Sequence, residues 1–475
     1  MTQIAVNTAR HEAALKAELL SDSSFPEKLY ALQYLLSIQS RGRALQLPPA
    51  DALPNVDPSQ YRVLQAYAEA MIAGASKQDA ALTLRQLSEL APPPAFANFA
   101  LSLYYMAYPK DGSALKAAMA EVAAHPSQDS RALLVELLGR YKRYSELRPL
   151  LDDPNYDGLI PSLLKRDVAL NPMDWPLLIK TLLPVAYEDM QLSVLALALL
   201  AGASWASLLL RFNGPLSWRE SAVQLALPAL LLGAASAHMT ILAIYWQEEQ
   251  LGLARGDDLI GQAIYCFAGI GLREELLKLL CFVPLIPFLA KRKDELEIFV
   301  LASLVGLGFA IEENIGYFES SQGLDAVGRF VTANFLHLSL TGVCGLTLTQ
   351  AILYRGSHIN TAVSTFGLAV LAHGAYDAFI IVPELAEYNL ATMVVFILIT
   401  YQYFTWIRHL RNEWRSKVSL TAHFTLGLTL VFGASYLLVA WESGPVESFL
   451  SLTEEALGLG ILLVLFYREI PEDIY

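Results

Sequence analysis

The chain has 475 residues, of which 55% are hydrophobic and only 17% are charged. Soluble domains carry about 25% charged residues, so a large part of this chain is expected to lie in a membrane. The 46 acidic residues outnumber the 33 basic ones, which argues against a nucleic-acid partner, because such a partner requires a basic face. The three cysteines, Cys266, Cys281 and Cys344, are too few and too scattered for a disulfide framework or a zinc finger, and they fit buried apolar positions.

The charges divide the chain near residue 190. Residues 1–190 hold 18 basic and 21 acidic side chains, whereas the longer stretch 191–475 holds only 15 and 25. The first part therefore has close to the charge density of a soluble domain, while long apolar runs dilute the charges of the second. We expect a soluble domain followed by a polytopic membrane domain whose partner is the lipid bilayer.

Residues 1–190 are predicted to be helical, because Ala and Leu dominate and β-branched residues are sparse. The first residues contain no uninterrupted apolar stretch, so no cleavable signal peptide is expected. Residues 57–91 and 93–125 each predict a helix pair with a spacing of about 34 residues, which favours an α-solenoid that binds a protein partner. A plain helical bundle is the alternative.

Nine segments of residues 191–475 are apolar over the roughly 20 residues that a spanning helix needs. Irregular backbone is not tolerated in contact with lipid, so the fold class is all-α, with a transmembrane helix bundle of about nine spans after the soluble helical domain. The segments are 192–211, 221–246, 260–290, 297–318, 330–354, 361–383, 388–407, 419–441 and 446–467.

Basic residues follow the third, fifth and seventh segments at Lys291, Arg355 and Arg408, whereas the loops after the second, sixth and eighth are acidic or poor in basic residues. The positive-inside rule places the basic loops in the cytoplasm. Counting back then puts residues 1–190 outside, which is difficult for a domain of this size without a signal peptide. A cytoplasmic N-terminal domain is therefore the alternative.

Spans three to six carry ionisable residues, each of which costs at least about 3 kcal/mol inside a bilayer. Such groups are placed there only where something compensates for the cost. The third span holds Arg273, Glu274, Glu275 and Lys278, the fourth ends with Glu312, Glu313, Asn314 and Tyr317, the fifth holds His337, and the sixth holds His373 and Asp377.

The depths of these residues allow them to converge within one cavity. At a rise of about 1.5 Å per residue, Glu313, His337 and Asp377 lie about 8–10 Å from the outer ends of their spans. The same arithmetic places His373 about 15 Å from its end and Glu274 about 21 Å from the start of the overlong third span. We therefore expect these side chains to meet in one polar cavity in the outer half of the bilayer.

Spacing within the helices supports the same cavity. Glu274 and Lys278 are four residues apart and share a helix face, so Lys278 can pair with Glu274 and lower the cost of its charge. Glu313 and Tyr317 have the same spacing, which allows the phenol hydroxyl to point into the cavity.

Two imidazoles with several carboxylates form a donor set that suits Zn²⁺, with one position open for water. A further glutamate is then available as general base, and Asn314 or Asp377 can orient a ligand or stabilise an oxyanion. Asp377 shares a helix face with His373. The reaction predicted is hydrolysis of a peptide bond at membrane depth. A metal-free site, in which Glu and His activate water directly, is the alternative.

Other chemistries lack their motifs. The sequence contains no His-Glu-x-x-His, no Gly-x-Ser-x-Gly and no Gly-rich phosphate loop, which excludes a zincin helix, a serine nucleophile of that type and an ATP-driven pump. A proton- or cation-coupled transporter that uses the same acids and histidines as a relay stays open, as does an inactive scaffold.

The order of these residues, each group on its own span, resembles the PrsW family of intramembrane proteases, which is related to the CAAX-prenyl endopeptidases. The resemblance covers about residues 195–385. It rests on Glu274-Glu275-x-x-Lys278, Glu313-Asn314-x-x-Tyr317, His337, and His373-Gly374-x-Tyr376-Asp377.

The resemblance implies a membrane-embedded endopeptidase, metal-dependent or glutamic, that acts on a membrane-anchored protein, and we expect it in a bacterial inner membrane. We divide the chain into a soluble helical domain at 1–190, a protease core at 191–385 and additional transmembrane helices at 386–475. The predicted catalytic residues are Glu274, Glu275, Glu313, His337 and His373, with Glu313, His337 and His373 as metal ligands and Lys278, Asn314, Tyr317 and Asp377 in support.

Overall fold

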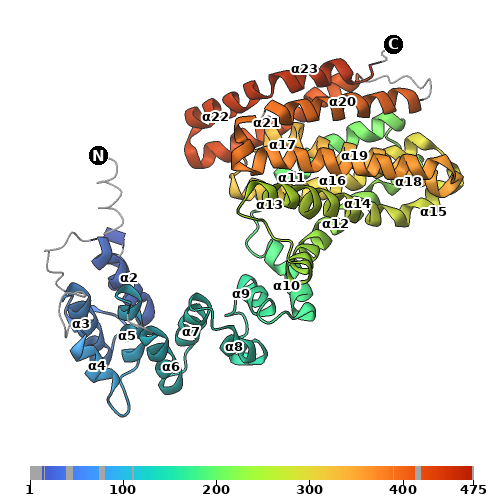
Figure 1. Cartoon of the computed structure of the whole chain (residues 1–475). Helices are drawn as coiled ribbons and strands as arrows, with labels where there is room; N and C mark the ends of the chain where they lie inside the picture. Colours follow the sequence, from blue (N-terminus) through green and yellow to red (C-terminus); the bar gives the residue numbers. More distant parts are fainter. Residues whose placement is uncertain are drawn as a thin grey trace. The chain divides into compact units, whose positions relative to one another are not determined.

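A computed structural model describes residues 13–14, 16–38, 47–73, 81–109, 112–388, 390–411 and 419–472 (Figure 1). These residues form helices, and among them there is no strand, only one isolated bridge between Leu170 and Met173. The predicted all-α fold class is confirmed. The helices separate into two units, Met1–Glu188 and Asp189–Tyr475, called unit 1 and unit 2 below.

Unit 1 consists of short helices joined by turns. The helices are α2 (Phe25–Ile38), η1 (Ala50–Ala52), α3 (Pro58–Ala73), α4 (Leu82–Ser88), α5 (Ala97–Ala107), α6 (Ser113–Ala124), α7 (Gln128–Arg140), α8 (Tyr144–Leu147), η2 (Arg148–Asp152), η3 (Pro154–Tyr156), α9 (Ser162–Ala169) and α10 (Trp175–Tyr187). The solenoid arrangement proposed for this region stays a prediction.

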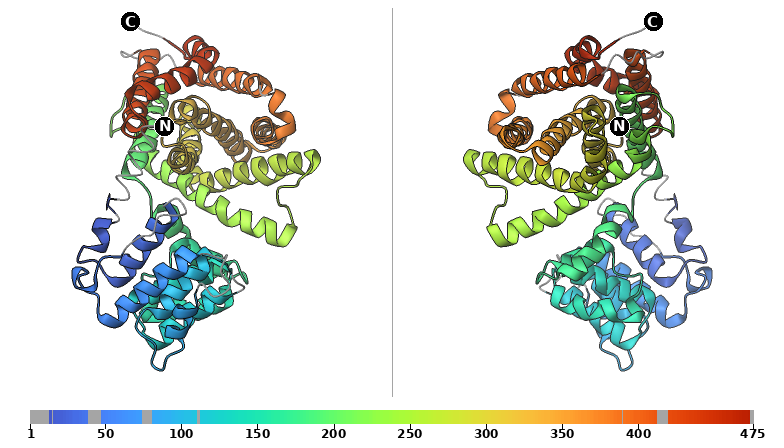
Figure 2. Two further views of the ribbon diagram at one scale, coloured as in Figure 1. Left: turned by 90° about the vertical axis from the view of Figure 1, so that its left-hand side faces the viewer. Right: turned by 90° about the vertical axis from the view of Figure 1, so that its right-hand side faces the viewer.

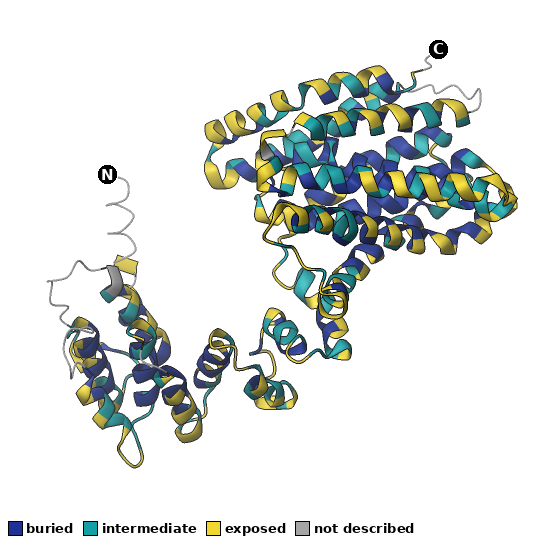
Figure 3. Cartoon of the chain, viewed as in Figure 1, coloured by how far each residue is buried: buried dark blue, intermediate teal, exposed yellow. Residues whose placement is uncertain are grey.

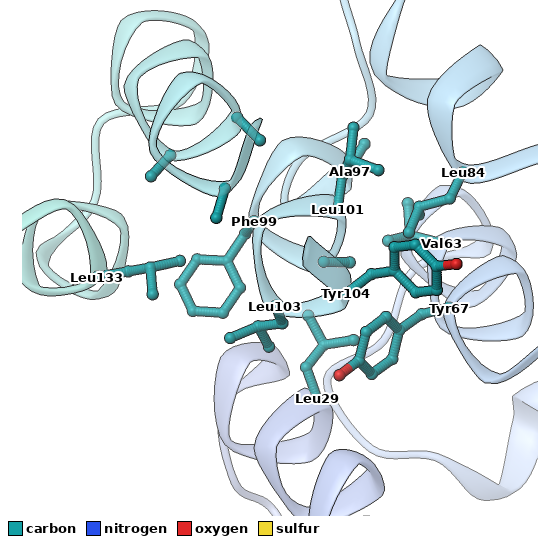
Figure 4. Close-up of a cluster of buried hydrophobic side chains, with 14 of the residues drawn as sticks. Leu29, Val63, Tyr67, Leu84, Ala97, Phe99, Leu101, Leu103, Tyr104 and Leu133 are labelled. Atoms are coloured by element: carbon teal, nitrogen blue, oxygen red, sulfur yellow. The ribbon is translucent and has the colours of Figure 1, made fainter. Parts of the chain in front are cut away.

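The core of unit 1 is built from side chains of successive helices. Figure 4 shows Leu29 of α2, Tyr67 of α3, Leu84 of α4, Phe99 of α5 and Leu133 of α7 meeting in this core, each at most 2% exposed. Apolar burial of this kind is the main favourable contribution to folding, so unit 1 has its own stabilising core.

Helix α5 begins without a side-chain cap of its own, and a residue of α6 takes that place. The buried Glu121 carboxylate accepts hydrogen bonds from the backbone N–H groups of Phe96, Asn98 and Phe99 at 2.7, 3.0 and 3.2 Å. The first N–H groups of a helix have no partner within the helix, so Glu121 both satisfies them and ties α6 to α5.

Unit 2 contains the long apolar helices together with short ones that connect them. Its helices are α11 (Leu192–Asn213), α12 (Ser221–Leu251), α13 (Leu259–Ile264), the π-helix η4 (Tyr265–Gly271), α14 (Leu272–Phe282), η5 (Val283–Leu285), α15 (Ile286–Arg292), α16 (Glu295–Ser320), α17 (Ala326–Val331), α18 (Ala333–Tyr354), α19 (Ser357–Ile381), η6 (Pro383–Tyr388), α20 (Leu390–Leu410), α21 (Leu420–Ser443), α22 (Pro445–Gly458) and α23 (Gly460–Glu469).

Within the described residues, seven helices are long and apolar enough to cross a membrane, and the pair α22–α23, bent by 55°, makes up to eight. This agrees roughly with the nine spans expected. The remaining segment, 260–290, is helical but differs from a regular span in two ways. The π-helix and a 3₁₀ turn interrupt it, and its four charged residues make it too polar to count as a span by composition.

Helices α16 and α18 form the centre of unit 2. The most apolar part of α16 is 83% buried, against 22% for α19 and 28% for α12 and α20. Figure 2 shows these central helices in gold between green and orange-to-red ones, and Figure 3 shows the outer helices with exposed residues along their length. Exposed apolar faces on the outside and a buried pair inside are what a helix bundle in lipid requires.

Two glycines permit the close helix approaches that bring the ionisable residues together. A Cβ on Gly306 of α16 would lie 2.3 Å from the backbone oxygen of His337 on α18. A Cβ on Gly374 of α19 would lie 2.5 Å from the ring of Phe267 in η4. Only glycine allows approaches as close as these, as is common where membrane helices pack.

Candidate active site

A cavity of about 220 Å³ lies among helices α14, α16, α17, α18 and α19. Six of the nine predicted site residues line it, namely Glu274, Glu313, Tyr317, His337, His373 and Asp377. The other three, Glu275, Lys278 and Asn314, are fully buried and are not among the lining residues. Residues that are far apart in the sequence are therefore brought into one polar site.

The imidazole of His373 has a different carboxylate on each nitrogen. Its Nδ1 lies 2.8 Å from Oε1 of Glu275, which is completely buried. Its Nε2 faces Oδ2 of Asp377 at 3.4 Å and Oε2 of Glu274 at 3.7 Å, on the cavity side. A carboxylate on Nδ1 is the usual device that fixes the ring of a metal-binding or catalytic histidine.

Lys278 pairs with Glu275 and not with Glu274 as the spacing had suggested. Its Nζ donates to Oε1 of Glu275 at 2.6 Å and lies 3.0 Å from Nδ1 of His337. Both partners of the ion pair have completely buried side chains. The Glu274–Lys278 pair that the spacing allowed is not the one formed. Positions three and four residues apart are both within reach of a lysine, and Glu275 is also the residue that contacts His373.

Glu313 is held from two directions. Its Oε2 lies 3.1 Å from Nε2 of His337 and accepts a hydrogen bond from Nη2 of Arg329 at 2.7 Å. Nε of Arg329 donates to Oδ1 of Asn314 at 2.6 Å, and the guanidinium lies 3.6 Å from the ring centre of Tyr317. Arg329 thus connects three predicted residues of α16.

Arg329 itself was not predicted from the sequence. It lies on the short helix α17, one residue before the apolar stretch assigned to the fifth span, so it was counted with the loop. Its position at the start of a span that carries His337 is the only signal in the sequence, and that signal is weak.

The structure also distinguishes the neighbouring acids Glu312 and Glu313. Glu312 faces α12, where its Oε1 lies 3.4 Å from Nε2 of His238, and it does not line the cavity. Glu313 does line it, as expected from the order of the sequence. Arg273, which the sequence left without an assignment, lines the cavity too and lies 3.9 Å from Glu274.

A divalent cation fits the donor set. One ligand atom each from Glu274, His337 and His373 lie within 4.8 Å of one another, and all three residues are buried. Two imidazoles and one carboxylate are a common ligand set for zinc, with a position left for water. This set differs in one carboxylate from the predicted Glu313, His337 and His373.

These features define a multi-pass membrane protein with a buried carboxylate–histidine centre between its helices. Residues 221–402 match the family described as PrsW family intramembrane metalloprotease, and this stretch contains all nine predicted site residues. The chain thus carries a PrsW-family domain, and the resemblance inferred from the sequence is confirmed. Unit 1, α11 and α21–α23 lie outside the matched stretch. Searches of curated proteins and of solved structures returned no match.

Proposed function

We propose that this protein is an intramembrane endopeptidase that hydrolyses a peptide bond of a membrane-anchored protein, in the inner membrane of a bacterium. One observation carries the proposal: carboxylates and imidazoles from four helices line one cavity inside the stretch that matches an intramembrane metalloprotease family. Charged groups in such surroundings are expensive and are placed there for function.

In this proposal Glu274, His337 and His373 would hold a Zn²⁺ ion. When bound, zinc would supply Lewis-acid polarisation of the scissile carbonyl and make water easier to deprotonate. Glu313 lies on the cavity wall beside His337 and takes the proton of the attacking water. Arg329 holds the Glu313 carboxylate in place, and Glu275 holds the ring of His373.

A metal-free glutamic mechanism is the second candidate, and one contact favours it. Lys278 Nζ lies 3.0 Å from Nδ1 of His337. If the ammonium donates to Nδ1, then Nε2 carries the proton and donates to Glu313, so this nitrogen is not available to a metal. Glu313 and His337 would then activate water together.

Turnover in proteoliposomes tests the function. Single-span proteins fused to a reporter serve as substrates, and Glu313→Gln and His373→Ala are expected to lower kcat at least about 100-fold. Glu312→Gln is the matched control, since this neighbouring carboxyl faces α12, and its activity should stay close to that of the unmodified protein. Full turnover in both site variants would contradict the proposal, and proton-coupled uptake by the vesicles would favour a transporter instead.

Elemental analysis and chelation separate the two mechanisms. Stoichiometric zinc that is lost together with activity on treatment with a chelator, and is restored by added Zn²⁺, supports the metal site. Activity that survives complete removal of zinc supports the glutamic mechanism. In the metal case Glu274→Gln should lower the zinc content, because it removes one of the three ligands.

We further propose that unit 1 binds a protein partner or the soluble part of the substrate, as its separate core allows. This role is tested by comparing the full chain with residues 189–475, each acting on substrates that have a soluble domain and on substrates that lack one. A loss confined to substrates with a soluble domain is expected, and equal turnover of both kinds by the shortened chain would contradict it.

A further inference from the structure

The short helix α17 carries Arg329 and has only six residues, Ala326–Val331. It joins α18 through the single residue Thr332, and Ala326–Tyr354 together form one apolar span. Contacts with other helices add to this junction in fixing the backbone of α17. The direction of the Arg329 guanidinium, and with it the hydrogen bond to Glu313, therefore depends on what holds the α17 backbone.

Three side chains bind the backbone of α17 and of the turn before it. Nε1 of Trp205 donates to the carbonyl of Phe330 at 2.7 Å, and Oγ of Ser435 donates to the carbonyl of Gly323 at 2.6 Å. Oε1 of Glu455 accepts the N–H of Gly328 at 2.8 Å, one residue before Arg329. The donors Trp205 and Ser435 are buried, at 1% and 0% exposure.

All three side chains lie outside the matched stretch 221–402. Trp205 belongs to α11, Ser435 to α21 and Glu455 to α22, so three separate helices reach the same short segment. Aromatic packing strengthens the arrangement, because the centre of the Phe330 ring lies 5.6 Å from that of Trp205 and 5.9 Å from that of Phe424 of α21.

We propose that α11, α21 and α22 form a clamp that sets the position of α17, with Trp205, Ser435 and Glu455 as positioning residues for Arg329. The clamp keeps the guanidinium on the carboxylate of Glu313, and its effect on catalysis rests on the function proposed above. The helices outside the protease domain thereby become part of what makes its site active.

Two substitutions, Glu455→Ala and Gly328→Ala, break the hydrogen bond between Glu455 and Gly328 from opposite sides. Glu455→Ala removes the acceptor. The conservative variant Glu455→Gln keeps a carbonyl oxygen for the N–H of Gly328. Gly328→Ala leaves Glu455 intact but places a Cβ 2.5 Å from Oε1, so the two must separate. Ser448→Ala is the matched control, since Ser448 is buried on the same helix and its hydroxyl bonds only the Gly444 carbonyl in the contacts described.

The full chain in detergent is examined by hydrogen–deuterium exchange of residues 324–332 and by the kinetics of substrate cleavage. Glu455→Ala and Gly328→Ala should speed exchange in this segment and lower kcat about tenfold, with KM changed by less than about twofold, because misplacement acts on the transition state. Glu455→Gln should restore most of both. In an Arg329→Gln background, Glu455→Ala should cause no further loss of kcat, since both act through one contact.

Unchanged exchange in Glu455→Ala and Gly328→Ala would overturn the clamp, whatever the activity. Faster exchange with unchanged kcat, or a full additional loss in the Arg329→Gln background, would overturn its link to Arg329. If the unmodified protein cleaves no substrate while exchange responds as expected, the clamp is supported and only the proposed function fails.

Discussion

Replacing Glu275 by glutamine tests the buried ion pair that lies behind His373. The side chains of Glu275 and Lys278 are both completely buried and 2.6 Å apart, and Glu275 also holds Nδ1 of His373 at 2.8 Å. Removing the carboxylate takes away the ion-pair partner of the Lys278 ammonium, which is completely buried and keeps only the His337 ring as a close polar contact. Breaking a buried pair in this way costs about 3–5 kcal/mol of the free energy of unfolding.

A double substitution separates stability from function. Glu275→Gln with Lys278→Met removes both charges, so it should recover most of the lost stability. It does not restore the carboxylate on His373. If the site holds zinc, as proposed above, zinc affinity should therefore stay about 10–100-fold below that of the unmodified protein. Glu136→Gln breaks the exposed pair with Arg140 and serves as control, with an expected loss of less than about 1 kcal/mol.

Thermal unfolding in detergent and competition with a chelating dye give the two measurements. Glu275→Gln should lower both the melting temperature and the zinc affinity, and the double variant should recover only the first. A single variant that melts and binds zinc like the unmodified protein would refute the roles given to Glu275. If melting temperature and zinc affinity both recover in the double variant, zinc affinity depends on the buried charges and not on the contact between Glu275 and His373.

Gly374→Ala should lower the free energy of unfolding by about 1–3 kcal/mol and reduce activity, because the added Cβ would meet the backbone and ring of Phe267 in η4. Gly367→Ala is the control, since its Cβ has open space and should change neither quantity. Equal effects of the two variants in melting and turnover assays would contradict this. Glu121→Ala should lower the unfolding free energy of unit 1 by at least about 2 kcal/mol because three N–H groups lose their acceptor, and denaturant unfolding against the half-exposed Glu136→Ala checks it. A guanidinium hydrogen bond lowers the pKa of Asp174, so its stabilisation is present at neutral pH and is lost as the pH falls below about 4. Asp174→Asn should therefore flatten the fall in the melting temperature of unit 1 on acidification, and an unchanged acid profile would show that the contact does not contribute.

The sequence alone determined most of the membrane helices and most of the ionisable residues of the site. A helix in lipid forms all its backbone hydrogen bonds within itself, so no distant segment is needed to complete it. A local run of apolar residues is therefore enough to locate a span. The high energy of a charge in lipid makes Glu274, His337 and His373 conspicuous within their apolar runs. The broken segment at 260–290 is harder to predict, since a π-helix has no sequence signature as clear as a run of apolar residues.

Only the tertiary structure decided which of these groups meet. Lys278 can reach either preceding glutamate, and the choice of Glu275 depends on His373, which lies 98 positions away from Glu275 in the chain. Arg329 lies just outside an apolar run, and Glu455 lies inside one without a partner that the sequence could indicate. The rotation of each helix, and hence the atom that each side chain faces, is set by packing against neighbours distant in sequence, and local patterns do not contain that information.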